Sequence, residues 1–154
     1  MKNFFKITAI FMFLATCASA EQSERYKRGL EELNKFDKES TQRLLDSLQP
    51  IAPDLTKYII EYPFGDIYAR RDKLDFKSRQ ISTISALAAL GYAKPQLKIH
   101  IKAGLNAGLT REEIIEIMTQ LSVYAGFPVA INGVLAAQEA VSYTHLTLPT
   151  SPKV

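Results

Sequence analysis

The sequence predicts an all-α fold, a single helical bundle of about six to eight helices. Apolar residues recur at steps of three and four along most of the chain, which is the period of an amphipathic helix. Proline, glycine and capping residues divide this pattern at the intervals expected for short helices. Before residue 141, no stretch alternates polar and apolar residues as a half-buried strand would.

In the first half of the chain, the predicted helices are divided by prolines. Pro53 suits a first helical turn, where its missing N–H costs nothing. We expect Pro63 and Gly65 to interrupt the helix that Pro53 begins, and Asp66 and Arg70 to form an exposed ion pair or to reach a pocket. The predicted segments are helices at 21–36, 39–48 and 53–62, a short turn or helix at 64–70, and a charged loop at 71–74.

The second half has clearer start and stop signals. Asp75 can cap a helix that Gly91 ends, and the nearly all-apolar face of this helix predicts a central position. Thr110 and Glu113 have the spacing of a capping box. The predicted helices run over 76–90, from Pro95 to Ala107, from 111 until Gly126, and onward from near Pro128.

The first twenty residues have the three regions of a secretory signal peptide. Lys2 and Lys6 precede an apolar run too short to span a bilayer comfortably, and Ala18-Ser19-Ala20 fits signal-peptidase cleavage. We therefore expect a periplasmic or secreted protein cut after Ala20, without an integral membrane span. Two alternatives are a lipoprotein anchored through Cys17 and a buried N-terminal helix.

The last segment, residues 141–154, departs from the helical pattern and is rich in threonine and proline. It resembles translated adapter sequence, so we expect a non-native or disordered tail; a genuine flexible tail is the alternative. The domain is then residues 21–140, which hold 16 basic and 16 acidic side chains. With no net charge, this body gives no indication of nucleic-acid binding.

His100 is the one histidine between residues 21 and 140. It lies beside the apolar stripe of its predicted helix, so it is either a structural histidine or a general acid or base. Gln96 projects one turn earlier on the same helix. The chain shows no spacing for a metal site, a phosphate-binding loop or a serine nucleophile, and no cofactor is expected.

Four stretches together resemble the carboxymuconolactone decarboxylase-like family, which has the alkylhydroperoxidase D-like fold. The most specific part runs from Ser78 to Gly133, where the motifs follow one another at the family's spacing. The stretches are ERYxxG (24–29), FGDIYAR (64–70), SRQISTISALAALG with QLKIH and AGLNAGLTREEI (78–114), and VYAGFPVAING (123–133).

The resemblance implies an all-α fold that assembles into homo-oligomers, trimers or hexamers, with pockets near subunit contacts. The redox branch of the family uses a glutamate, a C-x-x-C pair and a histidine. At those positions this chain has Gln80, Tyr92, Gln96 and His100, so only the histidine matches. Without a thiolate, peroxidase or disulfide-reductase activity is disfavoured.

The other branch resembles γ-carboxymuconolactone decarboxylase, which needs no cofactor. This implies a carboxy-lyase acting on a small carboxylated lactone or a related compound, with His100 as the acid that returns a proton to carbon. Gln96 and Tyr124 are then candidate hydrogen-bond donors to the substrate, and Arg70 a candidate partner for its carboxylate. A non-catalytic, oligomeric small-ligand-binding protein is the alternative function.

Overall fold

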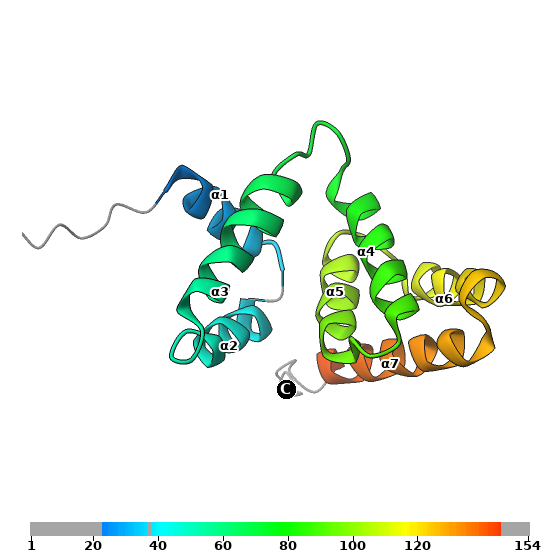
Figure 1. Cartoon of the computed structure of the whole chain (residues 1–154). Coiled ribbons are helices and arrows are strands. Elements are labelled where there is room, and N and C mark those ends of the chain that lie inside the picture. The colour runs from blue at the N-terminus through cyan, green and yellow to red at the C-terminus, as the bar shows by residue number, and fades with distance from the viewer. Residues whose placement is uncertain (1–22, 37, 146–154) are drawn as a thin grey trace, which may run out of the picture.

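The computed structural model describes residues 23–36 and 38–145 (Figure 1). Within these ranges every regular element is a helix, which confirms the all-α prediction. None of these helices is long and apolar enough to cross a membrane. The elements are α1 (Glu24–Leu33), α2 (Lys38–Leu48), α3 (Pro53–Ile59), the π-helix η1 (Ile60–Tyr68), α4 (Phe76–Leu90), α5 (Lys94–Asn106), α6 (Arg111–Ala125) and α7 (Phe127–His145).

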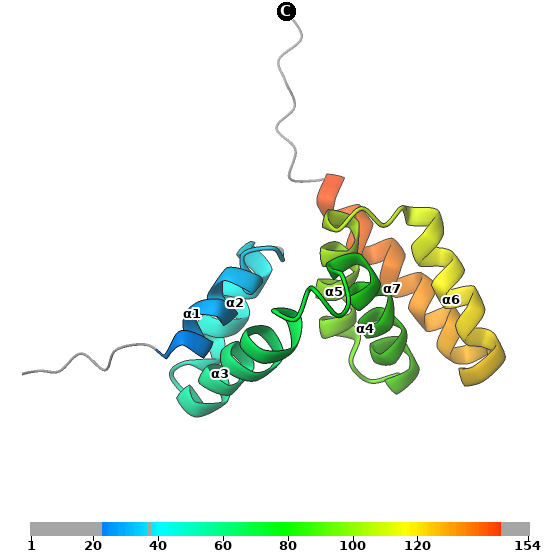
Figure 2. The ribbon, with the colours of Figure 1, turned by 90° about the horizontal axis from the view of Figure 1, so that it is seen from above.

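The helices form two groups that lie side by side in both views (Figures 1 and 2). We call α1, α2, α3 and η1 the N-terminal helices, and α4 to α7 the C-terminal bundle. Backbone contacts are dense within each group and sparse between them. The two groups are joined by the loop at 69–75 and by a cluster of aromatic side chains.

Two glycines allow α1 and η1 to cross in direct backbone contact. A Cβ atom on Gly29 would overlap the carbonyl group of Ile60, and one on Gly65 would overlap the carbonyl oxygen of Arg25. Any larger residue at either position would force the two helices apart. The glycines of the ERYxxG and FGDIYAR stretches are thereby explained by packing.

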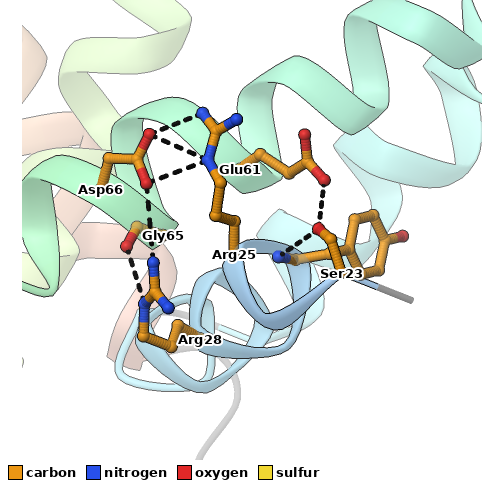
Figure 3. Close-up of polar contacts among 7 residues, drawn as sticks. Ser23, Arg25, Arg28, Glu61, Gly65 and Asp66 are labelled. Carbon is orange, nitrogen blue, oxygen red and sulfur yellow. Dashed lines mark hydrogen bonds and ion pairs between the residues drawn. The ribbon is translucent and has the colours of Figure 1, made fainter. Parts of the chain in front are cut away.

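Polar side chains form hydrogen bonds and ion pairs across the surface of the α1–η1 crossing (Figure 3). Arg25 donates to both carboxylate oxygens of Asp66 at 2.6–3.1 Å, and Arg28 donates to the carbonyl oxygen of Gly65 at 3.2 Å. The predicted pairing of Asp66 with Arg70 is therefore wrong. Asp66 faces α1 across the crossing, because the close approach of the backbones brings two α1 arginines within reach.

The predicted break at Pro63 and Gly65 is also wrong. The chain runs from α3 directly into η1, with Pro63 inside the π-helix. The wider π turn bonds each N–H to the carbonyl five residues back, as Ala69 does to Phe64 at 3.2 Å. This geometry accommodates a proline, which lacks a donor and clashes with the carbonyl four residues earlier in an α-helix.

The caps predicted in the C-terminal bundle are confirmed. The side chain of Asp75 accepts from the N–H of Ser78 at 3.0 Å, and Gly91 ends α4 with φ of 76°. Thr110 and Glu113 form both hydrogen bonds of a capping box at the start of α6. These caps satisfy backbone groups that the helix ends would otherwise leave unpaired.

The main core lies inside the C-terminal bundle. Ile84, Ile101, Ile114 and Met118 are at most 1% exposed and interlock across α4, α5 and α6. Gly133 lets α7 approach this core, because a Cβ there would overlap the sulfur of Met118. The central position expected for α4 holds for one of its faces, since Ile84 and Ala88 are buried. Its other side leaves apolar residues at the surface, among them Ile81 and Leu90.

The helical pattern continues past the predicted domain end at residue 140. Helix α7 extends to His145, so the expected break in the helical pattern at residue 141 is wrong. The assignment of residues 141–154 as a non-native or disordered tail stays a prediction. The apolar face ending in Ala137 and Ala140, both buried, carries the helix onward against α5 and α6. Residues 146–154, like the predicted signal peptide at 1–20, lie outside the described residues.

Candidate functional site

His100 lies in α5 at the junction of the N-terminal helices and the C-terminal bundle. Its neighbours on the helix, Ile101 and Ala103, are fully buried, and His100 itself is partly buried. Gly104 brings α5 close to α4, because a Cβ there would crowd Leu109 and Ile84. Close α4–α5 packing places the His100 ring against side chains from the preceding helix.

The polar contact of His100 is with Gln80. The Nδ1 atom of His100 lies 3.0 Å from Oε1 of Gln80, which is on α4 and 0% exposed. The amide nitrogen Nε2 of Gln80 is also buried and has no hydrogen-bond partner in the described part of the chain. A buried amide with one end bonded and the other end unpaired is uncommon, because the unpaired donor keeps its full desolvation cost.

Aromatic rings also pack against His100. Phe36, from the segment after α1, meets the imidazole edge-on with ring centroids 5.4 Å apart. Tyr68, at the end of η1, lies 6.3 Å from it, and the Tyr68 hydroxyl is 2.7 Å from the hydroxyl of Thr83 on α4. Phe76 contacts both Phe36 and Tyr68. Both helical groups thus supply walls of this site.

The apolar side chains around His100 change the pKa of its imidazole. Burial lowers the pKa of His100 from 6.5 to about 4, because the apolar walls disfavour the charged imidazolium. The ring is therefore neutral at pH 7. Burial likewise raises the pKa of Tyr68, although the hydrogen bond with Thr83 and the charge of Arg79 act in the opposite direction. The site consequently presents neutral hydrogen-bonding groups at rest.

Two arginines lie at the edge of the aromatic cluster. The Cζ atom of Arg71 is 5.0 Å from the centroid of the Phe76 ring, and its guanidinium binds the buried carboxylate of Glu32. Arg79 donates to the backbone carbonyls of Arg70 and Leu74 at 2.7 and 3.1 Å. Positive charge is thereby held beside a site whose other groups are neutral.

The other predicted site residues lie at the surface. Arg70 is exposed and contributes its backbone carbonyl to Arg79, while Gln96 is exposed one turn before His100 on α5. Tyr124 is 80% exposed near the end of α6. Within the described ranges no hydrogen bond connects any of these three side chains to His100. Their assignment to substrate binding stays a prediction.

The described residues contain no group of three histidine, cysteine, aspartate or glutamate side chains that could hold a metal ion. Sequence reasoning treated Gln80 only as a replacement for a redox glutamate, and it missed Phe36 and Tyr68. The sequence held a signal for Gln80, because it lies four residues before Ile84 and eight before Ala88, on the apolar face of the predicted helix. Phe36 and Tyr68 carried no such signal, since they reach His100 only through the packing of the N-terminal helices.

Comparison with known proteins assigns the chain to a family. The model of the carboxymuconolactone decarboxylase family matches residues 53–139. This chain belongs to the carboxymuconolactone decarboxylase family. The match contains Gln80, Tyr68 and His100, whereas Phe36 lies before it. One wall of the candidate site in this carboxymuconolactone decarboxylase family member thus comes from outside the matched region.

Three proteins of known sequence are similar to this family member over more than half of its length. The 4-carboxymuconolactone decarboxylase of Acinetobacter baylyi is 31% identical over 117 residues, which are 75% of this chain and 86% of the relative. The nitrosuccinic acid decarboxylase of Metarhizium robertsii is 26% identical over 104 residues, 68% of this chain and 71% of the relative. An uncharacterized 15.0 kDa protein of Paracoccus denitrificans is 32% identical over 93 residues, 60% of this chain and 69% of the relative.

Proposed function

We propose that this protein is a cofactor-free decarboxylase that acts on a small carboxylated lactone or a related compound. The observation that carries the proposal is the placement of the His100 imidazole, which Gln80 holds beside the rings of Phe36 and Tyr68. Two relatives whose names give different substrates are both decarboxylases, which supports the reaction class more than any one substrate.

The reaction needs a place for charge and a source of one proton. When the bond to the carboxylate carbon breaks, its electron pair passes to the lactone carbonyl oxygen and carbon dioxide leaves. A proton must then be delivered to a carbon atom of the lactone ring. We assign this delivery to His100. An anionic substrate beside the imidazole raises the pKa of His100, so the imidazole takes a proton from water and the hydroxide passes to bulk solvent. The imidazolium then gives this proton to carbon and becomes neutral again.

Substrate recognition needs cationic groups. Arg70 remains the residue proposed from the sequence for the substrate carboxylate, with Gln96 and Tyr124 as hydrogen-bond donors. Arg71 and Arg79 also supply positive charge beside the aromatic cluster, while their guanidinium groups bind Glu32 and backbone carbonyls. All five side chains are therefore targets for substitution.

Assembly and export form part of the same proposal. An apolar strip on α6 and α7 stays exposed in the single chain, and it continues into a hollow of about 320 Å³ between these helices. Such a strip suits contact with a second copy of the chain. Its members are Val123, Tyr124, Phe127, Ile131 and Leu135. Export to the periplasm, or secretion, is proposed from the signal-peptide pattern of residues 1–20.

A second candidate is a ligand-binding protein without turnover. It is favoured by the low pKa of His100 and by the presence of Gln80, because neither side chain can act as a proton-donating acid at pH 7 without a bound ligand. Such a protein would bind small carboxylated compounds in the same site and release them unchanged.

The two candidates are separated by assaying the mature protein from Glu21. γ-Carboxymuconolactone and nitrosuccinate are supplied separately, and substrate loss and carbon dioxide release are followed. His100→Asn is compared with Gln49→Ala, a change at an exposed position outside the site. Turnover lost only in His100→Asn, with its fold and assembly kept, supports the decarboxylase. Binding without turnover by the folded wild type supports the second candidate.

A further inference from the structure

We propose that Gln80 is the positioning residue that fixes the His100 ring with its proton on Nδ1, and that the free N–H of Gln80 donates to the carbonyl oxygen of the bound substrate. The inference rests on the proposed function and adds a second group to its site. It gives one buried amide two tasks, one for each end.

The first task follows from the hydrogen bond between the two side chains. An amide oxygen can only accept, so the Nδ1 atom of His100, 3.0 Å from Oε1 of Gln80, must donate. A neutral imidazole carries one proton, and burial keeps this ring neutral at pH 7. The lone pair is therefore on Nε2, which is the atom left to take a proton from water and deliver it to substrate.

The second task follows from the other end of the amide. The Nε2 atom of Gln80 is buried without a partner in the described part of the chain, whereas the nearby hydroxyls of Tyr68 and Thr83 pair with each other. An unpaired buried donor costs about 1–3 kcal/mol. A leucine or methionine would fill the same space without that cost, so the polar end needs a partner that is present only during function.

Packing keeps Gln80 from turning away to find another partner. The side chain is 0% exposed, and α5 lies directly against it at Gly104. A Cβ atom at Gly104 would be 3.7 Å from the Cβ of Gln80 and closer still to Leu109 and Ile84. Close packing and the hydrogen bond to His100 thus hold the side chain before any ligand arrives, and preorganised donors are the effective ones for stabilising developing charge.

The chemistry favours a neutral donor at this position. In the proposed reaction the lactone carbonyl oxygen becomes an enolate oxygen, and an N–H group stabilises that charge. The Nε2–H bond of a protonated His100 breaks as the new C–H bond forms, and the Nδ1–H bond to Gln80 persists throughout. A carboxylate at position 80 would repel the enolate, so glutamine suits decarboxylation better than glutamate would.

The first test reads the tautomer directly and needs no turnover. Nitrogen-15 NMR of the mature wild-type protein at pH 7 is expected to show a protonated Nδ1 and an unprotonated Nε2 for His100. In Gln80→Leu the preference for the Nδ1–H form should be lost, and in Gln80→Glu the pKa of His100 should rise because a carboxylate stabilises the imidazolium. A wild-type spectrum with the proton on Nε2 would overturn the positioning role.

The second test addresses the donor. If the wild type decarboxylates γ-carboxymuconolactone, Gln80→Leu should lower kcat about 100-fold or more with a smaller change in KM. A kcat within twofold of wild type overturns the donor role. Titration with γ-crotonolactone, which has the carbonyl but no carboxylate to lose, should shift the Gln80 side-chain amide signal, identified by its absence in Gln80→Leu.

These readouts separate the inference from the proposed function. An unshifted amide signal at saturating γ-crotonolactone contradicts the donor role whether or not the wild type turns over. A wild type that is inactive on γ-carboxymuconolactone but has an Nδ1–H tautomer and a shifted amide supports both tasks of Gln80 and rejects γ-carboxymuconolactone as the substrate. If Gln80→Leu fails to fold, the wild-type tautomer and the γ-crotonolactone titration still decide the question, with Gln80→Glu as the variant that identifies the signal.

Discussion

The guanidinium of Arg71 binds the carboxylate of Glu32 through three hydrogen bonds of 2.7–3.3 Å. Glu32 is on α1 and 7% exposed, and Arg71 is on the loop that leads into α4. Burial alone would raise the pKa of Glu32, but hydrogen bonds from Arg71 and Lys35 lower it on balance. The pair thus joins the N-terminal helices to the segment that starts the C-terminal bundle.

Loss of this pair should cost stability. Arg71→Ala leaves the Glu32 carboxylate buried with Lys35 as its remaining cation, so we expect the free energy of unfolding to fall by about 1–3 kcal/mol. Urea denaturation measures the change. Lys73→Ala, which removes an exposed cation paired with Asp72, should cost less than about 0.5 kcal/mol. Equal losses in the two variants would contradict a structural role for the pair.

The crossing of α1 and η1 should tolerate no side chain at its glycines. Gly29→Ala places a methyl group on the carbonyl of Ile60, and we expect a loss of about 2 kcal/mol or more in the free energy of unfolding. Gly91→Ala is the control, because it meets no atom within 4 Å and costs only the strain of a positive φ, about 1 kcal/mol. Thermal unfolding that ranks Gly91→Ala as the more damaging change would contradict the proposed contact.

The low pKa of His100 predicts a pH-dependent stability. Between pH 6.5 and about 4 the unfolded chain binds a proton at this histidine and the folded chain does not, so the folded state loses stability as the pH falls. The full difference is about 3 kcal/mol. The folded state has this extra stability above pH 6.5 and has lost it near pH 4.

Denaturation of wild type and His100→Asn at several pH values measures this difference. The wild type should lose about 3 kcal/mol more than the variant between pH 7 and pH 4. Parallel curves for the two proteins would show that His100 titrates normally in the folded state.

The same pKa predicts the pH dependence of the proposed reaction. If the imidazolium delivers the proton, kcat/KM should rise about tenfold per pH unit as the pH falls from 7 and level off near pH 4. The profile of kcat should turn at a higher pH, because a bound anion raises the pKa of His100. A kcat/KM that is constant at neutral pH and falls below pH 4 would instead identify neutral His100 as a base.

The exposed strip on α6 and α7 predicts assembly through this face. Phe127→Glu places a charge at a side chain that is 74% exposed in the single chain, so it should shift the protein from oligomer to monomer in light scattering after size-exclusion chromatography. Ile51→Glu, at a residue 78% exposed beyond α2, is the matched control. An assembly unchanged by Phe127→Glu would exclude this strip as the contact.

Much of the fold was predictable because it depends on local signals. The caps at Asp75 and Thr110 and the stop at Gly91 are read from side-chain chemistry within a few residues. The helix break predicted at Pro63 was wrong because the effect of a proline depends on whether the helix can widen to a π turn. The extension to His145 was missed because an apolar face packed on the bundle outweighs the weak helix propensity of residues after Ala140.

The site was predictable only where it follows helix periodicity. His100 was found because it lies beside the apolar stripe of α5. Arg70, Gln96 and Tyr124 were chosen by position and chemistry, and each is exposed in the single chain. Phe36 and Tyr68 enter the site through the crossing of α1 and η1, and no local pattern reports such a long-range contact.

The side chains around His100 come from two helical groups, and this division affects the fraction of molecules in which the site is assembled. Phe36 and Tyr68 belong to the N-terminal helices, which have a small core of their own and few backbone contacts with the bundle. Such a unit can open while the larger part of the molecule stays folded. Each opening rehydrates His100 and returns it to ordinary solution chemistry. The working fraction of the protein is therefore governed by the free energy of this partial opening, which can be much smaller than that of global unfolding.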